Sequence, residues 1–156
     1  MYSPGRLGRG EALNYGITIT NTELIAFQDF DDNSYPQRLE KQVSYMKKNP
    51  RVAWSCGYSY AINDFRNTSI LRKLPLEHDD IVKEMVYQIP WDLTLVICRK
   101  KALTEIQKVR FINSDQEDLI MVINLIKNNW KIGNITDIIG EHFEHKTAFL
   151  TQIIHI

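Results

Sequence analysis

The stretch LIAFQDFDDNSYPQRLEKQ, from Leu24 to Gln42, places three different local patterns next to one another. A short apolar run comes first, and an amphipathic segment comes last. Between them lie three acidic residues, Asp29, Asp31 and Asp32. A short apolar run bounded by turn-forming residues is typical of a buried strand. The stretch therefore predicts a strand, an acidic loop and a helix, in that order.

The amphipathic part carries both a start signal and a helical repeat. Ser34 and Gln37 have the spacing of a capping box, in which two side chains satisfy the first free N–H groups of a helix. Leu39, Val43 and Met46 then recur at helical spacing, and the Asn–Pro pair that follows disfavours further helix. We therefore expect a helix capped by Ser34 that ends before this pair.

The rest of the chain alternates between strand-like and helix-like patterns, which favours an α/β layer architecture. Ser114 and Glu117 repeat the capping-box spacing ahead of the last helix, and its apolar repeat predicts deep packing. Strands are expected at 51–64 and 93–99, helices at 78–89, 100–106 and 118–129, and short strands broken by Gly133 and Gly140 over 131–150.

Composition argues against several classes of protein. Of the 156 residues, 44% are hydrophobic and 24% charged, as expected of one globular domain. The 19 basic and 19 acidic residues cancel, so net charge gives no reason to expect nucleic acid as a partner.

We expect a cytoplasmic chain without a signal peptide or a transmembrane segment, since no apolar run approaches ~18 residues. Cys56 and Cys98 lack CxxC spacing and are expected to be buried, reduced thiols.

The spacing of the aspartates allows three interpretations. A solvated turn is the simplest, because Asp and Asn favour turns and the first turn of a helix. A calcium loop is the second, although Ser34 stands where that loop needs glycine and the preceding residues favour a strand instead of a helix. The first, third, fifth and twelfth positions of the calcium loop would be Asp29, Asp31, Asn33 and Glu40.

A catalytic metal site is the third interpretation. Mg²⁺ and Mn²⁺ accept one or two carboxylates together with phosphate oxygens, so acidic side chains can hold such an ion against a diphosphate. Ligand sites of open α/β sheets lie at the carboxyl ends of strands, where these aspartates are expected. Spacing alone does not choose among the three interpretations.

An ordered series of segments resembles one enzyme family. EALNYGI (11–17) and the stretch from Leu24 to Gln42 are followed by KKNPRVA (47–53), WDLTLVICRKKALTEI (91–106) and QEDLIMVINLIKNNWKIGNI (116–135). In this order they resemble the family-two glycosyltransferases of the GT-A fold, from about residue 8 to residue 147. The resemblance implies an α/β fold: a partial GT-A domain, Rossmann-like, with a mixed sheet flanked by helices. The domain would cover residues 1–150, and residues 151–156 would form a tail.

The resemblance also implies the roles of site residues. Asp29, Asp31 and Asp32 match a DXD-type motif, which binds the sugar donor and, through the last two, a Mn²⁺ or Mg²⁺ ion. His145 lies where the family tends to have a histidine beside the donor phosphates or the metal. Asp118 matches the general base, which takes the acceptor proton in an inverting transfer.

Other residues near these motifs are less constrained. Arg9 lies near where the family often has a basic residue that contacts the nucleotide base. Glu117 and Asp118 also fit the acidic first turn of a helix, and Glu117 keeps no assigned role. His142 is expected to be an ordinary surface or half-buried histidine. Trp91 and Asp92 lie where the family often has residues that face the acceptor, yet Trp91 is expected to be a core or rim aromatic, because large aromatic side chains mostly serve packing.

The implied function is transfer of a sugar from a nucleotide-sugar donor, in first place a UDP-sugar, to a glycan, lipid or protein acceptor. A complete GT-A domain begins with strand–helix–strand units that clasp the nucleotide base, whereas only ten residues precede EALN here. We therefore expect an N-terminally incomplete domain, with any membrane association arising from missing parts. The alternative is an inactive fragment, or a scaffold or interaction domain, derived from the same fold.

Overall fold

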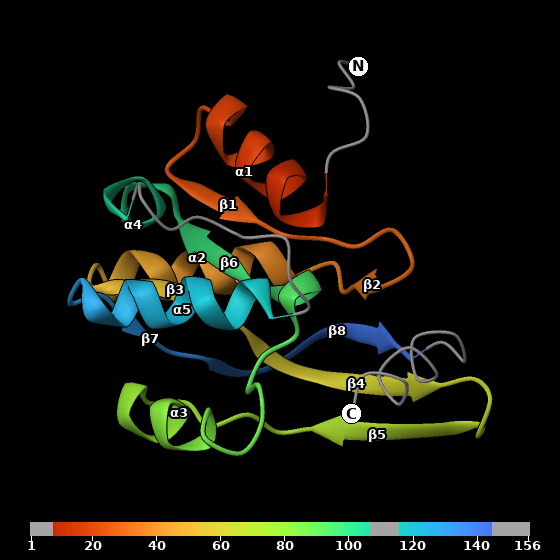
Figure 1. Ribbon diagram of the computed structural model, residues 1–156. Coiled ribbons are helices and arrows are strands. Elements are labelled where there is room, and N and C mark those ends of the chain that lie inside the picture. The colour runs from red at the N-terminus through yellow and green to blue at the C-terminus, as the bar shows by residue number, and fades with distance from the viewer. Residues whose placement is uncertain (1–7, 107–115, 145–156) are drawn as a thin grey trace.

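The computed structural model describes residues 8–106 and 116–144, in which two four-stranded mixed sheets are flanked by helices (Figure 1). The helices are α1 (Arg9–Ile19), α2 (Arg38–Lys48), α3 (His78–Glu84), α4 (Lys100–Glu105) and α5 (Glu117–Lys127), with a 3₁₀ turn η1 (Leu93–Leu95). The strands are β1 (Leu24–Ala26), β2 (Asn33–Ser34), β3 (Val52–Ser55), β4 (Gly57–Asn63), β5 (Thr68–Arg72), β6 (Ile97–Arg99), β7 (Lys131–Ile132) and β8 (Ile135–Phe143). The predicted α/β class is confirmed.

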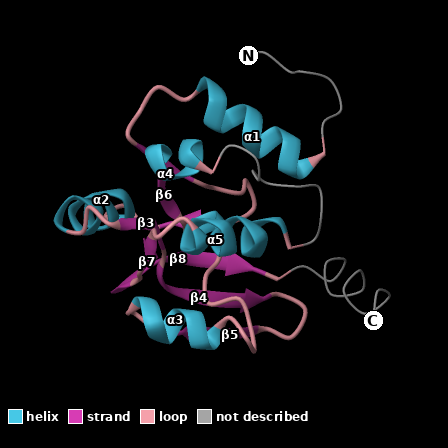
Figure 2. Ribbon diagram, turned by 60° about the vertical axis from the view of Figure 1, so that its left-hand side comes forward, coloured by secondary structure: helices cyan, strands magenta, loops and turns pink. Residues whose placement is uncertain are grey.

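The first sheet has the strand order β1–β6–β3–β7 and lies between two helices. β1 and β3 both run antiparallel to β6, whereas β3 and β7 are parallel. Figures 1 and 2 show α2 and α5 on opposite faces of this sheet. Every residue of β3 is buried, as expected of a strand that is covered on both faces.

The second sheet has the order β2–β8–β4–β5 and continues the first one. β3 passes into β4 through Cys56, and β7 passes into β8 through Gly133 and Asn134. The Cys56 N–H donates to the side-chain oxygen of Asn134 at 2.9 Å. The side-chain nitrogen of Asn134 donates in turn to the carbonyl of Pro75 at 2.8 Å. This buried side chain therefore satisfies the backbone at the bend between the two sheets.

A buried line of aromatic rings joins the sheet to the segments at its edge. The ring centroids of Phe27 and Trp54 are 6.0 Å apart, as are those of Trp54 and Trp91. The second pair is edge-to-face at 74°, an arrangement that stabilises beyond its area burial. The line connects the end of β1 to the segment that leads into η1.

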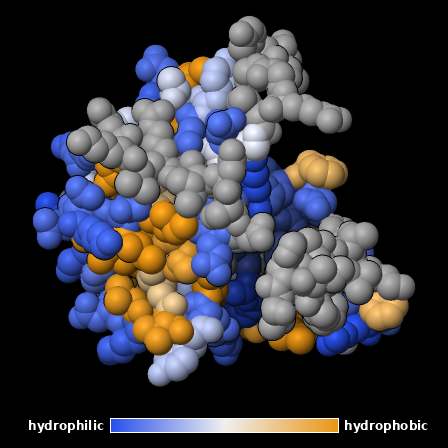
Figure 3. All heavy atoms as spheres, in the orientation of Figure 1, coloured by the Kyte–Doolittle hydropathy of each residue, from blue (hydrophilic) through white to orange (hydrophobic). Residues whose placement is uncertain are grey.

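The helix α5 packs on the sheet through Met121, Val122 and Leu125, all fully buried, so the predicted deep packing is confirmed. The sequence predicts a buried stripe of Leu119, Ile123 and Ile126, widened by Val122 and Leu125, but Ile123 is 37% exposed, so the buried stripe is shifted. Figure 3 shows apolar side chains gathered over α5 and α3 on this face of the molecule. α5 therefore presents apolar residues both to the core and to solvent.

A strand, an acidic loop and a helix follow one another between Leu24 and Gln42 as predicted, but the predicted cap of the helix is wrong. α2 has Gln37 at its N-cap position, with no side-chain capping bond. Ser34 lies in β2, where it pairs with Gly140 of β8, and its hydroxyl accepts a hydrogen bond from the side chain of Arg38 in place of a backbone N–H of the helix. The N-cap position of α5 is Gln116, and the proposed cap residue Ser114 lies outside the described residues.

Two further expectations about boundaries are wrong. The segment 51–64 is divided into β3 and β4 at Cys56. Its N–H donates to the side chain of Asn134, and its carbonyl accepts the N–H of Ile135, so Cys56 bonds to the bend between β7 and β8. The segment 93–99 opens with η1, so that only its last residues form β6. The expected helix at 78–89 is confirmed in its first half as α3, and the one at 100–106 is confirmed as α4.

Gly140 lies inside β8 and does not break it, contrary to expectation. A Cβ atom at this position would clash with the carbonyl oxygen of Asn33 and would lie 2.6 Å from Cδ2 of Leu95. The absence of a side chain therefore lets β2 approach β8 closely. Gly133, in contrast, separates β7 from β8 as expected.

Candidate active site

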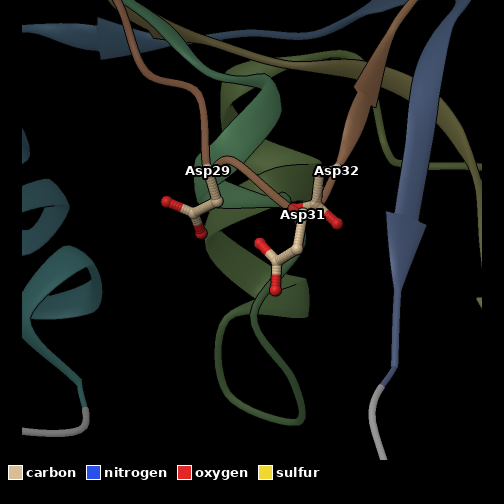
Figure 4. A group of neighbouring side chains, drawn as sticks. All are labelled: Asp29, Asp31 and Asp32. Carbon is tan, nitrogen blue, oxygen red and sulfur yellow. The ribbon is translucent and has the colours of Figure 1, made fainter.

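The three aspartates lie in the loop that connects β1 to β2. One carboxylate oxygen from each lies within 4.8 Å of those from the other two. Asp29 and Asp31 are exposed and point to the same side of the loop, whereas Asp32 lies at its end, beside β2 (Figure 4). Carboxylate oxygens at this spacing are suitable ligands for Mg²⁺ or Mn²⁺, so the donor set fits such an ion.

Asp32 anchors the end of this loop to β8. Its Oδ1 accepts the backbone N–H of Phe143 at 2.8 Å, and its Oδ2 lies 3.1 Å from Nδ1 of His142. The residue is only 8% exposed, and these contacts compensate the burial of its carboxylate. The acidic loop is thereby attached to a strand more than a hundred residues away in the sequence.

Asp29 is held by two other segments. Its backbone N–H donates to Oγ1 of Thr94 in η1 at 2.9 Å, and its Oδ2 lies 3.7 Å from Nη2 of Arg9. Burial raises the pKa of Asp29, Arg9 opposes the rise, and the charges of Asp32 and Asp31 add to it. The loop thus concentrates negative charge that a bound cation would relieve.

Arg38 supports the loop from the core side. The guanidinium is buried and donates to the carbonyl of Phe27 at 2.8 Å, to Oε1 of Gln28 at 2.9 Å and to Oγ of Ser34 at 2.6 Å. Burial lowers the pKa of Arg38 from its ordinary value. This one side chain therefore fixes both ends of the segment that carries the aspartates.

Asp118 occupies the first turn of α5 and faces the same cavity as Asp29. The indole N–H of Trp91 donates to its Oδ2 at 2.8 Å, and the backbone N–H of Leu119 donates to its Oδ1 at 2.8 Å. The cavity has a volume of about 320 Å³ and its lining includes Arg9, Asp29, Arg72, Trp91, Asp118 and His142. Three of the sequence-predicted site residues therefore meet at one cavity.

Arg9 links the acidic loop to α5. Besides its contact with Asp29, its Nε lies 3.1 Å from Oε1 of Glu117. Glu117 is only 2% exposed, so the nearby guanidinium helps to compensate the burial of its carboxylate. The role that the sequence left open for Glu117 is thus an ion pair between the first turns of α1 and α5.

Sequence reasoning missed several residues at the cavity. Arg72, on β5, forms an ion pair with the buried Asp92, whose other oxygen accepts the hydroxyl of Ser59 at 2.6 Å. No sequence motif identified Arg72 as a residue of the site. His142 lines the cavity beside Asp32, although no pattern in the sequence favoured it. His145, the predicted histidine, lies outside the described residues.

The calcium-loop interpretation is wrong. A strand, not a helix, precedes Asp29, and Nδ2 of Asn33 donates to Oε2 of Glu141 in the sheet at 3.0 Å. Glu40 lines a different cavity of about 550 Å³, between α2 and the start of β8. The would-be ligands of the loop are therefore directed to separate parts of the molecule.

Comparisons with known proteins support the same family as the motifs. The sequence profile described as "Glycosyl transferase family 2" matches residues 1–106, and the chain therefore belongs to that family. A curated relative, the "Amylovoran biosynthesis glycosyltransferase AmsE" of Erwinia amylovora, is 29% identical over 133 residues, covering 85% of this chain and 49% of its own. The "Uncharacterized glycosyltransferase MJ1057" of Methanocaldococcus jannaschii is 28% identical over 152 residues, covering 94% of this chain and 51% of its own.

The fold also matches a solved structure, described as "Crystal structure of S. aureus TarS 1-349". The TM-score is 0.65 at 14% identity, over 87% of this chain and 40% of that one, and the predicted GT-A fold class is confirmed. The chain spans about half the length of the curated relatives it matches. Among the described residues, no helix has the length and apolar character needed to cross a membrane.

Proposed function

We propose that the protein transfers a sugar from a nucleotide-sugar donor, in first place a UDP-sugar, to an acceptor hydroxyl on a glycan, lipid or protein, with inversion at the anomeric carbon. The observation that carries this proposal is the common cavity of Asp29 and Asp118. Membership of glycosyl transferase family 2 supports sugar transfer in general. We assign the activity to a domain of residues 1–150 and treat 151–156 as a tail.

The acidic loop is proposed as the donor and metal site. Asp31 and Asp32 would bind Mn²⁺ or Mg²⁺, and Asp29 would contact the donor beside them. A bound divalent ion stabilises the negative charge that develops on the departing diphosphate. Arg9, at the rim of the cavity, would contact the nucleotide. His145 is proposed as a further metal contact on the family resemblance alone.

Asp118 is proposed as the general base. Its carboxylate accepts the proton of the acceptor hydroxyl while the hydroxyl oxygen attacks the anomeric carbon and the diphosphate leaves on the opposite side. A single displacement of this kind inverts the configuration of the sugar. The half-buried position of Asp118 at the cavity wall gives an acceptor access to the carboxylate.

Release of UDP from a panel of UDP-sugars, with Mn²⁺ and candidate acceptors, tests the proposal. We expect Asp118→Asn to lower turnover by ~10²-fold or more while UDP binding stays close to that of the wild type. Asp137→Asn, which changes an aspartate paired with Lys41 outside the cavity, is the matched control. Full turnover in Asp118→Asn would exclude it as the base. Metal-dependent UDP binding without any turnover would favour the alternative of a non-catalytic domain.

A further inference from the structure

We propose that Trp91 is a positioning residue that holds the carboxylate of Asp118 in the orientation needed for proton transfer. This inference rests on the proposed function, because it takes Asp118 as the base. The sequence predicts Trp91 to be a packing residue, and its 3% exposure agrees with that. Its indole N–H nevertheless donates to Oδ2 of Asp118 at 2.8 Å, at the wall of the cavity.

Two hydrogen bonds to different oxygens fix the plane of the Asp118 carboxylate. Trp91 donates to Oδ2, and the backbone N–H of Leu119 donates to Oδ1. Each oxygen of a carboxylate can accept more than one hydrogen bond, so both keep capacity for an acceptor hydroxyl. Without the indole, the carboxylate would be restrained at one oxygen only and would be free to turn away from the cavity.

Trp91 itself is held from two sides. Its ring packs edge-to-face on Trp54, which packs on Phe27, two residues before Asp29. The next residue along the chain, Asp92, is fixed by its ion pair with Arg72 and by the hydroxyl of Ser59. The indole therefore has little freedom to follow the carboxylate if it moves. The same buried rings also support the loop that carries the proposed donor ligands.

The kinetic test replaces Trp91 with phenylalanine, which keeps an aromatic ring and removes the N–H donor. We expect Trp91→Phe to lower kcat by ~10-fold or more, with the KM for the UDP-sugar unchanged, because misalignment of a catalytic group slows the reaction without weakening donor binding. Trp130→Phe is the matched control. It removes an indole bond of 2.9 Å to Glu105, a residue that does not line the cavity.

An NMR measurement tests the contact without relying on turnover. In ¹⁵N-labelled protein the indole resonance of Trp91 is assigned by its loss in Trp91→Phe. We expect the indole proton signal of Trp91 to move upfield in Asp118→Ala, since the charged acceptor is removed. The signal of Trp130 should stay unchanged.

The outcomes separate this inference from the proposed function. Unchanged kcat in Trp91→Phe, or an indole signal of Trp91 that does not respond to Asp118→Ala, overturns the positioning role. Absence of turnover in the wild type, with every tested donor, rejects the proposed function and the catalytic role of Trp91 with it. The indole signal then still decides whether Trp91 restrains Asp118.

Discussion

The Nε atom of Arg9, at the start of α1, lies 3.1 Å from the buried carboxylate of Glu117, at the start of α5. This pair joins the first element of the described structure to the helix that carries the candidate base. Because Glu117 is almost fully buried, the guanidinium compensates part of the cost of burying its carboxylate. The wall of the cavity between Asp29 and Asp118 therefore depends on Arg9.

Replacement of Arg9 by glutamine should destabilise the protein by about 1–2 kcal/mol, because the buried carboxylate of Glu117 loses a nearby cation. The partial exposure of Arg9 limits the size of this loss. Urea unfolding measures the change. Arg9→Lys, which keeps the charge, should recover part of the loss. Lys83→Gln breaks an exposed ion pair with Asp80 and should leave the free energy of unfolding close to that of the wild type. Equal stability of Arg9→Gln and the wild type would contradict the importance of this pair.

Replacement of Arg38 by methionine should be more costly, at ~3 kcal/mol or more, since several buried acceptors around the acidic loop lose their donor together. Among them are the carbonyls of Phe27 and Val96. Arg51→Met is the matched control, because Arg51 is exposed and its guanidinium donates to the carbonyl of Asn129 at the surface. A thermal or urea unfolding series compares the two variants, and similar stabilities would show that Arg38 does not support the loop.

Two glycines should respond to alanine in opposite directions. Gly140→Ala places a Cβ against Asn33 and Leu95, so we expect a loss of ~1–3 kcal/mol and weaker pairing of β2 with β8. Gly16 lies inside α1, where an added methyl group would meet no atom within 4 Å apart from its chain neighbours and the backbone of its own helix. Gly16→Ala should therefore raise the free energy of unfolding by ~0.5–1 kcal/mol. Chemical unfolding measures both changes. A neutral Gly140→Ala would show that β2 does not need this close approach.

Cys56 and Cys98 are buried free thiols, as the sequence predicted, and burial raises the pKa of Cys56 from 9.0 to about 11. The folded state therefore holds this proton more tightly than the unfolded state. Its contribution to stability is present below pH 9 and is lost as the pH rises toward 11. Unfolding free energies measured between pH 8 and pH 11 should fall less steeply in Cys56→Ala than in the wild type. Identical slopes would contradict a buried, protonated Cys56.

Local features of the fold were predictable because their signals are local. The apolar run before Asp29 and the helical repeat after it are read from neighbouring residues, and both elements form as β1 and α2. The ordered motifs identified Asp29 and Asp118 as candidates for one site, and both line the same cavity.

Features that depend on distant pairing were not predictable. Ser34 has the spacing of a helix cap, yet its pairing with Gly140 draws it into a sheet. Arg72 and Asp92 lie in segments with no common motif, and only the fold brings their charges together. The partners of Asp32 likewise come from β8, a strand that was expected to break at Gly140. Tertiary contacts decided each of these cases against a plausible local pattern.

Calorimetric titration of UDP, with and without Mn²⁺, tests whether the acidic loop after β1 binds a donor diphosphate through a metal ion. The wild type should bind UDP only when Mn²⁺ is present, and Asp31→Asn should weaken that binding by ~10-fold or more. Asp64→Asn, which changes an exposed aspartate outside the cavity, should bind like the wild type. UDP binding that is absent from the wild type, or that is the same with and without Mn²⁺, would exclude metal-dependent donor binding at this loop.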